Sequence, residues 1–220
     1  MAFQDLITAA QTYFPSLQVK YKDQSSLMKF LGKLLFFNPS FMTDYTTTIG
    51  TTIYAPNTQF FTLHPVSSSV VLLHEFVHMH DQKQVSQIAF QIAYLMPQIL
   101  ILPALLLFFW HWWVAVLAIL LLAAPLPAFF RMNSEKRAYI SSIYTMQKLG
   151  QRLNFDPMLT KQRDAFVGYF IDSSYYFMWW PFKNHLLNDF NQAIQAVQAG
   201  QRPYQDDQLF DMLDILVTKV

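Results

Sequence analysis

VVLLHEFVHM, residues 70–79, is a mostly apolar run that contains the pattern HExxH, with histidines at positions 74 and 78. If the run is helical, His74 and His78 lie one turn apart on the same side of the helix. That spacing allows two imidazoles to bind one Zn²⁺ at about 2.0–2.1 Å. Glu75 lies about 100° around the helix from His74, where it can take a proton from a water that the metal activates. The pattern predicts the active site of a zinc-dependent peptidase.

A second interpretation is that the two histidines are partly buried core residues and that the short motif matches by chance. Three features favour the metal site. No other charged residue lies between Val66 and His80, so Glu75 would be a buried carboxylate without a partner, which is costly. The serines at 67–69 are good N-cap candidates for the helix. The chain has only two glutamates, and the second, Glu135, follows where such a site would take a third ligand.

The composition indicates one domain with an unusually apolar sequence. The chain has 220 residues, of which 53% are hydrophobic and only 13% charged, compared with roughly 25% charged residues in an average protein. The net charge is +1 with no basic run, so we expect no nucleic-acid partner. There is no cysteine, which excludes disulfides and cysteine-based metal sites. Residues 1–20 lack a basic segment followed by an apolar run, so no signal peptide is expected.

The stretch before the motif predicts two helices and two strands. Apolar spacing predicts helices over residues 4–14 and 24–37. The Thr-rich stretch 44–55 predicts a strand with a bulge or bend at Gly50, and residues 59–63 a second short strand. His64 precedes a proline and is expected in a loop.

The segment after the motif contains no Asp, Glu, Lys or Arg from residue 84 to residue 130. Each half, about 89–110 and 112–130, is long enough to cross a hydrocarbon core of about 30 Å, and the aromatic cluster at 110–113 is typical of a membrane interface. Lys83 lies before the segment and Arg131 after it. We therefore expect a transmembrane helical hairpin, kinked by its prolines, with the active site on the cytoplasmic face. The alternatives are a buried hairpin of a soluble protein and an oligomer interface.

A third metal ligand is expected after this segment. Residues 133–139 open a predicted helix that runs to about Leu149, with Gly150 as its C-cap. Glu135 lies in the first turn of that helix and is the candidate ligand, although a solvated glutamate stabilised by the helix dipole is also possible there. Asp81, on the same face of the motif helix as the histidines, competes as a third ligand or as an acceptor for one imidazole.

The last third of the chain, residues 154–220, is expected to be helical. Peptide hydrolysis needs a donor that stabilises the developing oxyanion, and the candidates are Tyr139, Tyr175, Tyr176 and His185. No catalytic role is expected for His80 or His111. The aromatic cluster at 175–182 would belong to the core, to a membrane-surface patch or to a substrate groove.

The motif HEFVH at 74–78, the uncharged hairpin and SEKRAY at 134–139 resemble a gluzincin metallopeptidase. The order of these features resembles the integral-membrane HtpX and CAAX-prenyl-protease type, and also the minimal gluzincin core. The resemblance covers about residues 40–140. It implies that His74, His78 and Glu135 bind zinc and that Glu75 is the general base. The expected fold is an α+β, mostly helical zincin-like domain with a small sheet, formed by residues 1–83 and 131–220, with the hairpin of residues 84–130 inserted.

The expected function is a membrane-associated zinc metalloendopeptidase. The strand around residues 46–55, if it lies at an edge of the sheet, would bind an extended peptide by strand addition. The partners would be the bilayer and a membrane-proximal peptide or protein, with a homo-oligomer or larger assembly also possible. The alternative is a membrane-anchored or virion-type structural or assembly protein that keeps a zincin fold without general proteolytic activity. A peptidase that cuts only its own chain or one assembly partner is a third possibility.

Overall fold

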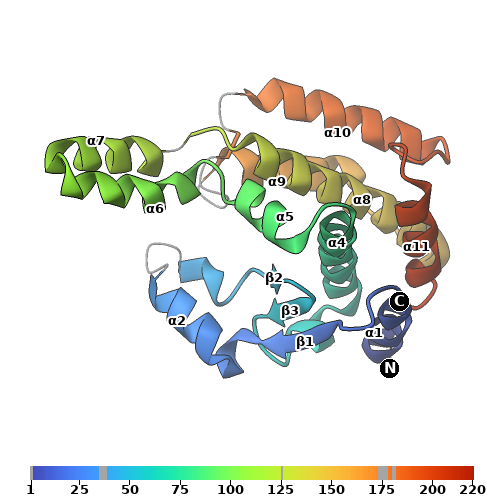
Figure 1. The fold of residues 1–220 in the computed structure, drawn as a ribbon. Helices are drawn as coiled ribbons and strands as arrows, with labels where there is room; N and C mark the ends of the chain where they lie inside the picture. The colour runs from blue at the N-terminus through green and yellow to red at the C-terminus, as the bar shows by residue number, and fades with distance from the viewer. Residues whose placement is uncertain (1, 35–38, 125, 173–177, 180–181) are drawn as a thin grey trace. The chain divides into compact units, whose positions relative to one another are not determined.

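The computed structural model describes residues 2–34, 39–124, 126–172, 178–179 and 182–220. These residues form a mostly helical chain with one small sheet, which confirms the coarse expectation from the sequence (Figure 1). The strands are β1 (Gln18–Tyr21), β2 (Thr47–Ile49) and β3 (Thr52–Ala55). The 3-10 helices are η1 (Lys22–Gln24), η2 (Pro39–Phe41), η3 (Gln98–Leu100) and η4 (Leu105–Phe109). The α-helices are α1 (Ala2–Tyr13), α2 (Ser26–Leu34), α3 (Phe60–Leu63), α4 (Pro65–Gln84), α5 (Gln87–Tyr94), α6 (Ile101–Ala104), α7 (Trp112–Ala123), α8 (Phe129–Leu153), α9 (Leu159–Ile171), α10 (Lys183–Gln198) and α11 (Asp207–Val217).

The chain divides into two compact units. Unit 1 comprises Met1–Gln82, Thr145–Pro157 and Gln205–Val220, and unit 2 comprises Lys83–Tyr144 and Met158–Tyr204. Unit 1 thus holds the sheet and the HExxH helix, whereas unit 2 holds the uncharged segment and Glu135. The division expected from the sequence, into residues 1–83, 84–130 and 131–220, is drawn from composition. The two units are instead defined by which residues contact one another.

The sheet of unit 1 has the order β1-β3-β2, with β1 parallel and β2 antiparallel to β3. β2 and β3 form a hairpin in which Thr48 pairs with Ile53. Gly50 has a φ of 61°, a conformation that glycine adopts without a steric penalty. The stretch 44–55 is therefore two strands joined by a turn, not one bent strand. β1 has no counterpart among the predicted elements.

The strand expected at residues 59–63 is wrong, because α3 occupies this stretch. The side-chain oxygen of Asn57 accepts a hydrogen bond of 2.9 Å from the backbone N–H of Gln59. Asparagine promotes such local turns through its side chain, and the chain continues into one helical turn. His64 lies at the C-cap of α3, outside both flanking helices, as expected.

Helix α4 carries the HExxH motif and is buried over most of its length. It begins at Pro65, a position that suits proline because the first N–H of a helix has no partner within the helix. The serines at 67–69 therefore lie inside the helix and are not its N-cap. Two of them instead donate to the preceding turn, Ser68 to the His64 carbonyl at 2.8 Å and Ser69 to the Pro65 carbonyl at 2.7 Å.

The core of unit 1 forms around α1, α4 and α11. Helices α1 and α11 pack against each other (Figure 1), and Leu6 and Leu213 are completely buried. The ring of Phe76, also completely buried, lies 5.9 Å from the ring of Phe14. Packing of this kind fixes the rotation of α4 about its axis and thereby the directions in which its polar side chains point.

Helix α8 is longer at both ends than expected. It begins at Phe129 and continues through Gly150 to Leu153, so Gly150 is not a C-cap. A Cβ at position 150 would lie 2.8 Å from the Phe155 carbonyl oxygen and 3.0 Å from Cδ of Pro157. The glycine is therefore required by the close approach of the returning chain and not by the end of the helix.

In unit 2 the rings of α8, α9 and α10 pack together. Tyr139 lies 4.5 Å from Phe166, and Phe170 lies 6.1 Å from Phe190, measured between ring centroids. Lys136 of α8 and Asp189 of α10 form an ion pair of 2.5 Å.

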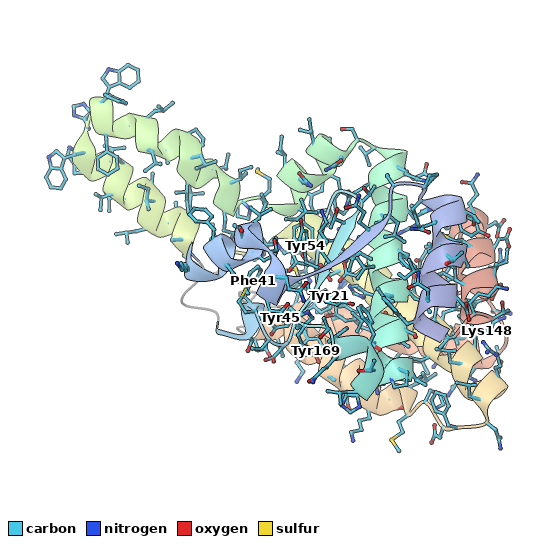
Figure 2. The ribbon with its side chains drawn as sticks, turned by 90° about the horizontal axis from the view of Figure 1, so that it is seen from below. Tyr21, Phe41, Tyr45, Tyr54, Lys148 and Tyr169 are labelled. Atoms are coloured by element: carbon cyan, nitrogen blue, oxygen red, sulfur yellow. The ribbon has the colours of Figure 1, made fainter. Side chains whose placement is uncertain are left out.

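The uncharged segment differs from the expected pair of continuous helices. Its first half breaks into α5, η3, α6 and η4 around Pro97, which has no N–H to donate. Among the described residues, no helix is by itself long and apolar enough to span a membrane. The stretches Gln87–Tyr94 and Gln98–Phe109 pass that test only together, with a bend of 89°. α6 and η4 pack alongside α7 (Figure 1), and side chains project outward along this hairpin (Figure 2), with Phe109 and Trp110 more than four-fifths exposed.

The packing of α4 predicts the effect of a core truncation. Phe76→Ala should lower the free energy of unfolding by about 3–5 kcal/mol, because it leaves a cavity beside Phe14. Urea denaturation monitored by circular dichroism measures this. Phe30→Ala, at a ring that is 63% exposed, is the control and should change stability by less than about 1 kcal/mol. Equal losses in the two variants would contradict the assignment of Phe76 to the core.

Candidate metal centre

His74 and His78 present their rings to each other from successive turns of α4. Both are buried, and their Nε2 atoms lie 3.2 Å apart with the ring planes at 80°. A tetrahedral ion with metal–nitrogen distances of about 2.0–2.1 Å places two ligand nitrogens about 3.3 Å apart. The spacing in α4 therefore matches that of two imidazoles bound to one ion.

Glu135 of α8 completes a group with these histidines. His74, His78 and Glu135 are all buried, each offers one ligand atom, and these atoms lie within 4.8 Å of one another. The group could therefore hold a metal ion. Glu135 is 3% exposed, so the alternative of a solvated glutamate is wrong. Asp81 does not belong to the group.

Glu75 is held by two threonines of unit 1. The hydroxyl of Thr46 donates to Oε1 of Glu75, and the hydroxyl of Thr48 donates to Oε2 at 2.6 Å. The carboxylate therefore has partners other than a metal, which corrects the argument that it would be buried without one. An ionised carboxylate accepts about four hydrogen bonds, so two remain for a water molecule.

Lys22, at the start of η1, is a buried cation of unit 1. Its side chain is completely buried, donates to the Phe41 carbonyl at 2.5 Å and lies 4.1 Å from the centre of the Phe41 ring, which is labelled in Figure 2. Burial lowers the pKa of Lys22 from 10.5 to about 8, and attraction to the Glu75 carboxylate acts in the opposite direction. At pH 7 Lys22 is thus mostly charged and partly balances Glu75.

Glu135 is held from within unit 2. The hydroxyl of Tyr94, at the end of α5, lies 2.5 Å from Oε1 of Glu135. The guanidinium of Arg131, one turn before Glu135 on α8, donates to the Tyr94 carbonyl at 3.0 Å. An outer shell of this kind orients ligating carboxylates in metal sites.

Two of the four candidate oxyanion donors, Tyr139 and His185, belong to unit 2. The ring of Tyr139 packs on Phe166. His185 is more than half exposed, with Nδ1 3.7 Å from Oδ2 of Asp189. A catalytic role for either residue stays a prediction. Tyr175 and Tyr176 lie outside the described residues.

Two histidines for which no catalytic role was expected lie outside the group of three. Nε2 of His80 is 3.4 Å from Oδ2 of Asp206, whose other oxygen caps α11 by accepting from the Leu209 N–H at 3.0 Å. His111 is exposed at the residue before α7.

The threonines, Lys22 and Tyr94 were not predicted as parts of the site. Signals for two of these features are nevertheless present in the sequence. Thr46 and Thr48 are two apart in an extended stretch and therefore share a face. Tyr94 is the sole tyrosine between residues 84 and 130, and a hydroxyl in an apolar segment needs a partner. For Lys22 we find no sequence signal.

No protein-family model, no curated protein and no solved structure matches the chain. The functional assignment therefore depends on the chemistry and geometry of these side chains.

The threonine contacts predict a hydroxyl-specific effect on stability. Thr48→Val removes one donor from the buried Glu75 carboxylate and should lower the free energy of unfolding by about 1–3 kcal/mol. Thr48→Ser, which keeps the hydroxyl, should lose less. Thr47→Val is the matched control, because adjacent strand residues point to opposite faces. Urea denaturation tests this, and a Thr48→Val protein as stable as the Thr47→Val protein would contradict the contact.

The lowered pKa of Lys22 predicts a pH dependence of stability. Since the unfolded chain holds this proton up to about pH 10.5 and the folded chain only to about pH 8, the free energy of unfolding should rise between these values. Relative to Lys22→Met, the wild type should gain about 2–3 kcal/mol from pH 7 to pH 10. Lys20→Met, at an exposed position, should follow the wild type. A constant difference between wild type and Lys22→Met across this range would show that Lys22 is not buried as described.

Proposed function

We propose that the chain is a zinc-dependent peptidase of the gluzincin kind, with His74, His78 and Glu135 as the metal ligands and Glu75 as the general base. One observation carries the proposal: a buried group of two imidazoles and a carboxylate is present, and the helix that supplies both imidazoles also carries Glu75. Three protein ligands of this type, with a fourth position left for water or substrate, are typical of catalytic zinc sites. The mostly helical α+β architecture is compatible with a zincin-like domain.

The donor set favours zinc over harder cations. Imidazole nitrogens suit zinc, copper, iron and nickel, whereas magnesium and calcium prefer oxygen ligands throughout. Zinc, when bound, would polarise the scissile carbonyl and make a water molecule more acidic. Glu75 would accept the proton of that water on its carboxylate and later donate it to the leaving amine.

The threonines give Glu75 a fixed orientation for this role. Because Thr46 and Thr48 each bond a different carboxylate oxygen, rotation of the carboxylate would break at least one hydrogen bond. A base held in this way needs little reorganisation when it takes a proton. Lys22 adds a buried positive charge that is attracted to the Glu75 carboxylate.

The position of β2 suggests where a substrate would bind. Among the strands that the structure describes, β2 pairs only with β3 and is therefore an edge strand. Strands at an edge can pair with an extended peptide, and Thr48 of β2 contacts Glu75 directly. The substrates would then be flexible peptide segments that lie along β2 with their scissile bonds near Glu75.

We further propose that the uncharged segment associates with a lipid bilayer and that the peptidase acts close to the cytoplasmic membrane surface. Two observations support this: residues 84–130 lack charge, and Phe109, Trp110 and Trp112 are at least two-thirds exposed. Tryptophan is enriched where protein meets the headgroup region.

A structural protein with a zincin fold is the second candidate, and one observation favours it. The contacts from Thr46 and Thr48 give Glu75 a role in joining β2 to α4, whether or not any reaction takes place. An intact Glu75 is therefore not sufficient to indicate catalysis.

Metal content and turnover of four proteins separate these candidates. The wild type should contain about one zinc and hydrolyse an unfolded protein such as casein. Glu75→Gln should keep the zinc and lose turnover by about 10²–10⁴-fold, whereas Glu135→Ala should lose the zinc. Asp81→Asn is the control and should keep both properties.

Two outcomes would contradict the proposal. A wild-type protein that takes up no zinc after reconstitution would remove the metal site. Zinc retained equally by the wild type and Glu75→Gln, with no turnover by either on unfolded substrates, would favour the structural candidate.

A further inference from the structure

Tyr94, which belongs to the uncharged segment of residues 84–130, contacts Glu135, the third candidate ligand. Its hydroxyl lies 2.5 Å from Oε1 of Glu135, a distance typical of a hydrogen bond from a hydroxyl to an ionised carboxylate. The sequence separation is 41 residues, so the contact depends on tertiary structure. Tyr94 is the last residue of α5, and its ring stacks on Phe90 at 6.2 Å.

Arg131 fixes Tyr94 from α8. Its Nε donates to the Tyr94 carbonyl at 3.0 Å, and its guanidinium carbon lies 5.4 Å from the centre of the Tyr94 ring. The same side chain donates to Oε1 of Gln98 at 3.1 Å. Arg131 is the first charged residue after the uncharged segment. It therefore links the end of this segment to Tyr94 and Gln98 in its first half.

We infer that Tyr94 is a positioning residue for Glu135 and that Arg131 holds Tyr94 in place. These two residues would then form part of the outer shell of the metal site. The inference deepens the proposed function and rests on Glu135 being a metal ligand. A carboxylate has two oxygens, so one can accept from the phenol while the other faces the metal.

The physical reason is the cost of orienting a glutamate. A glutamate side chain has three rotatable torsions, and holding it in one geometry costs conformational entropy. A hydrogen bond from a phenol that is itself fixed reduces the cost paid when metal binds, because the carboxylate is already oriented. Outer-shell partners of this kind change metal affinity by about 10–100-fold when they are removed.

The direct test is the zinc affinity of the full chain, measured by competition with a chromogenic chelator. Tyr94→Phe should weaken zinc binding by about 10–100-fold. The matched control is Tyr204→Phe, which also removes a phenol bonded to a side chain of α8, Ser141 at 2.5 Å, and should leave zinc affinity unchanged. Arg131→Met, which retains the Tyr94 phenol, should also weaken zinc binding. This second variant tests the inference if Tyr94→Phe does not fold.

A double-mutant cycle shows whether Tyr94 acts through Glu135. In a Glu135→Gln background, where zinc binding is already weak, Tyr94→Phe should cause no further loss, because the carboxylate it orients is gone. Two results would overturn the inference while the proposed function stands: wild-type affinity in Tyr94→Phe, or the same loss of affinity with and without the Glu135 carboxylate. A wild-type protein that binds no zinc would instead overturn the proposed function, and the inference with it.

Discussion

One buried helix, α4, carries two imidazoles and a carboxylate, those of His74, His78 and Glu75. The burial of these polar groups is the constraint on which the rest of the structure depends. A helix that is apolar on all sides can be buried without leaving a polar side chain unsatisfied, but α4 carries His74, Glu75 and His78 in the middle of its buried stretch. Each of these groups needs a partner, because an unsatisfied polar group costs about 1–3 kcal/mol or more when buried. Glu75 has such partners in Thr46 and Thr48, and the rings of His74 and His78 lie against each other.

The two buried glutamates, Glu75 of α4 and Glu135 of α8, each have partners within their own unit. In unit 1, Thr48 of β2 and Thr46 just before it donate to Glu75, and η1 supplies the buried charge of Lys22. In unit 2, α5 brings Tyr94 to Glu135. A polar network that is satisfied in this way holds its members in one geometry. The same hydrogen bonds that lower the cost of burial therefore also give the candidate base and the candidate ligand fixed orientations.

The local chemistry of the site was readable from the sequence, whereas its long-range contacts were not. His74 and His78 share a face because of helical spacing alone, so their pairing was predictable from the sequence. The bond from Thr48 to Glu75 joins residues 27 apart, and no periodicity reports such a contact. Errors at element boundaries have equally specific causes: Pro65 starts α4 ahead of the serines, and Gly150 serves a close backbone approach inside α8. In the uncharged segment, composition indicated an apolar environment but not the breaks that follow α5.

The central claim is that one metal ion binds to both imidazoles of α4 and to a carboxylate. X-ray absorption at the zinc edge, on protein loaded with one equivalent of zinc, tests this most directly. We expect a four-coordinate shell of nitrogen and oxygen at about 2.0–2.1 Å, with the outer-shell scattering of two imidazoles. A six-coordinate oxygen shell without imidazole scattering, or zinc that washes out during exchange into metal-free buffer, would contradict it.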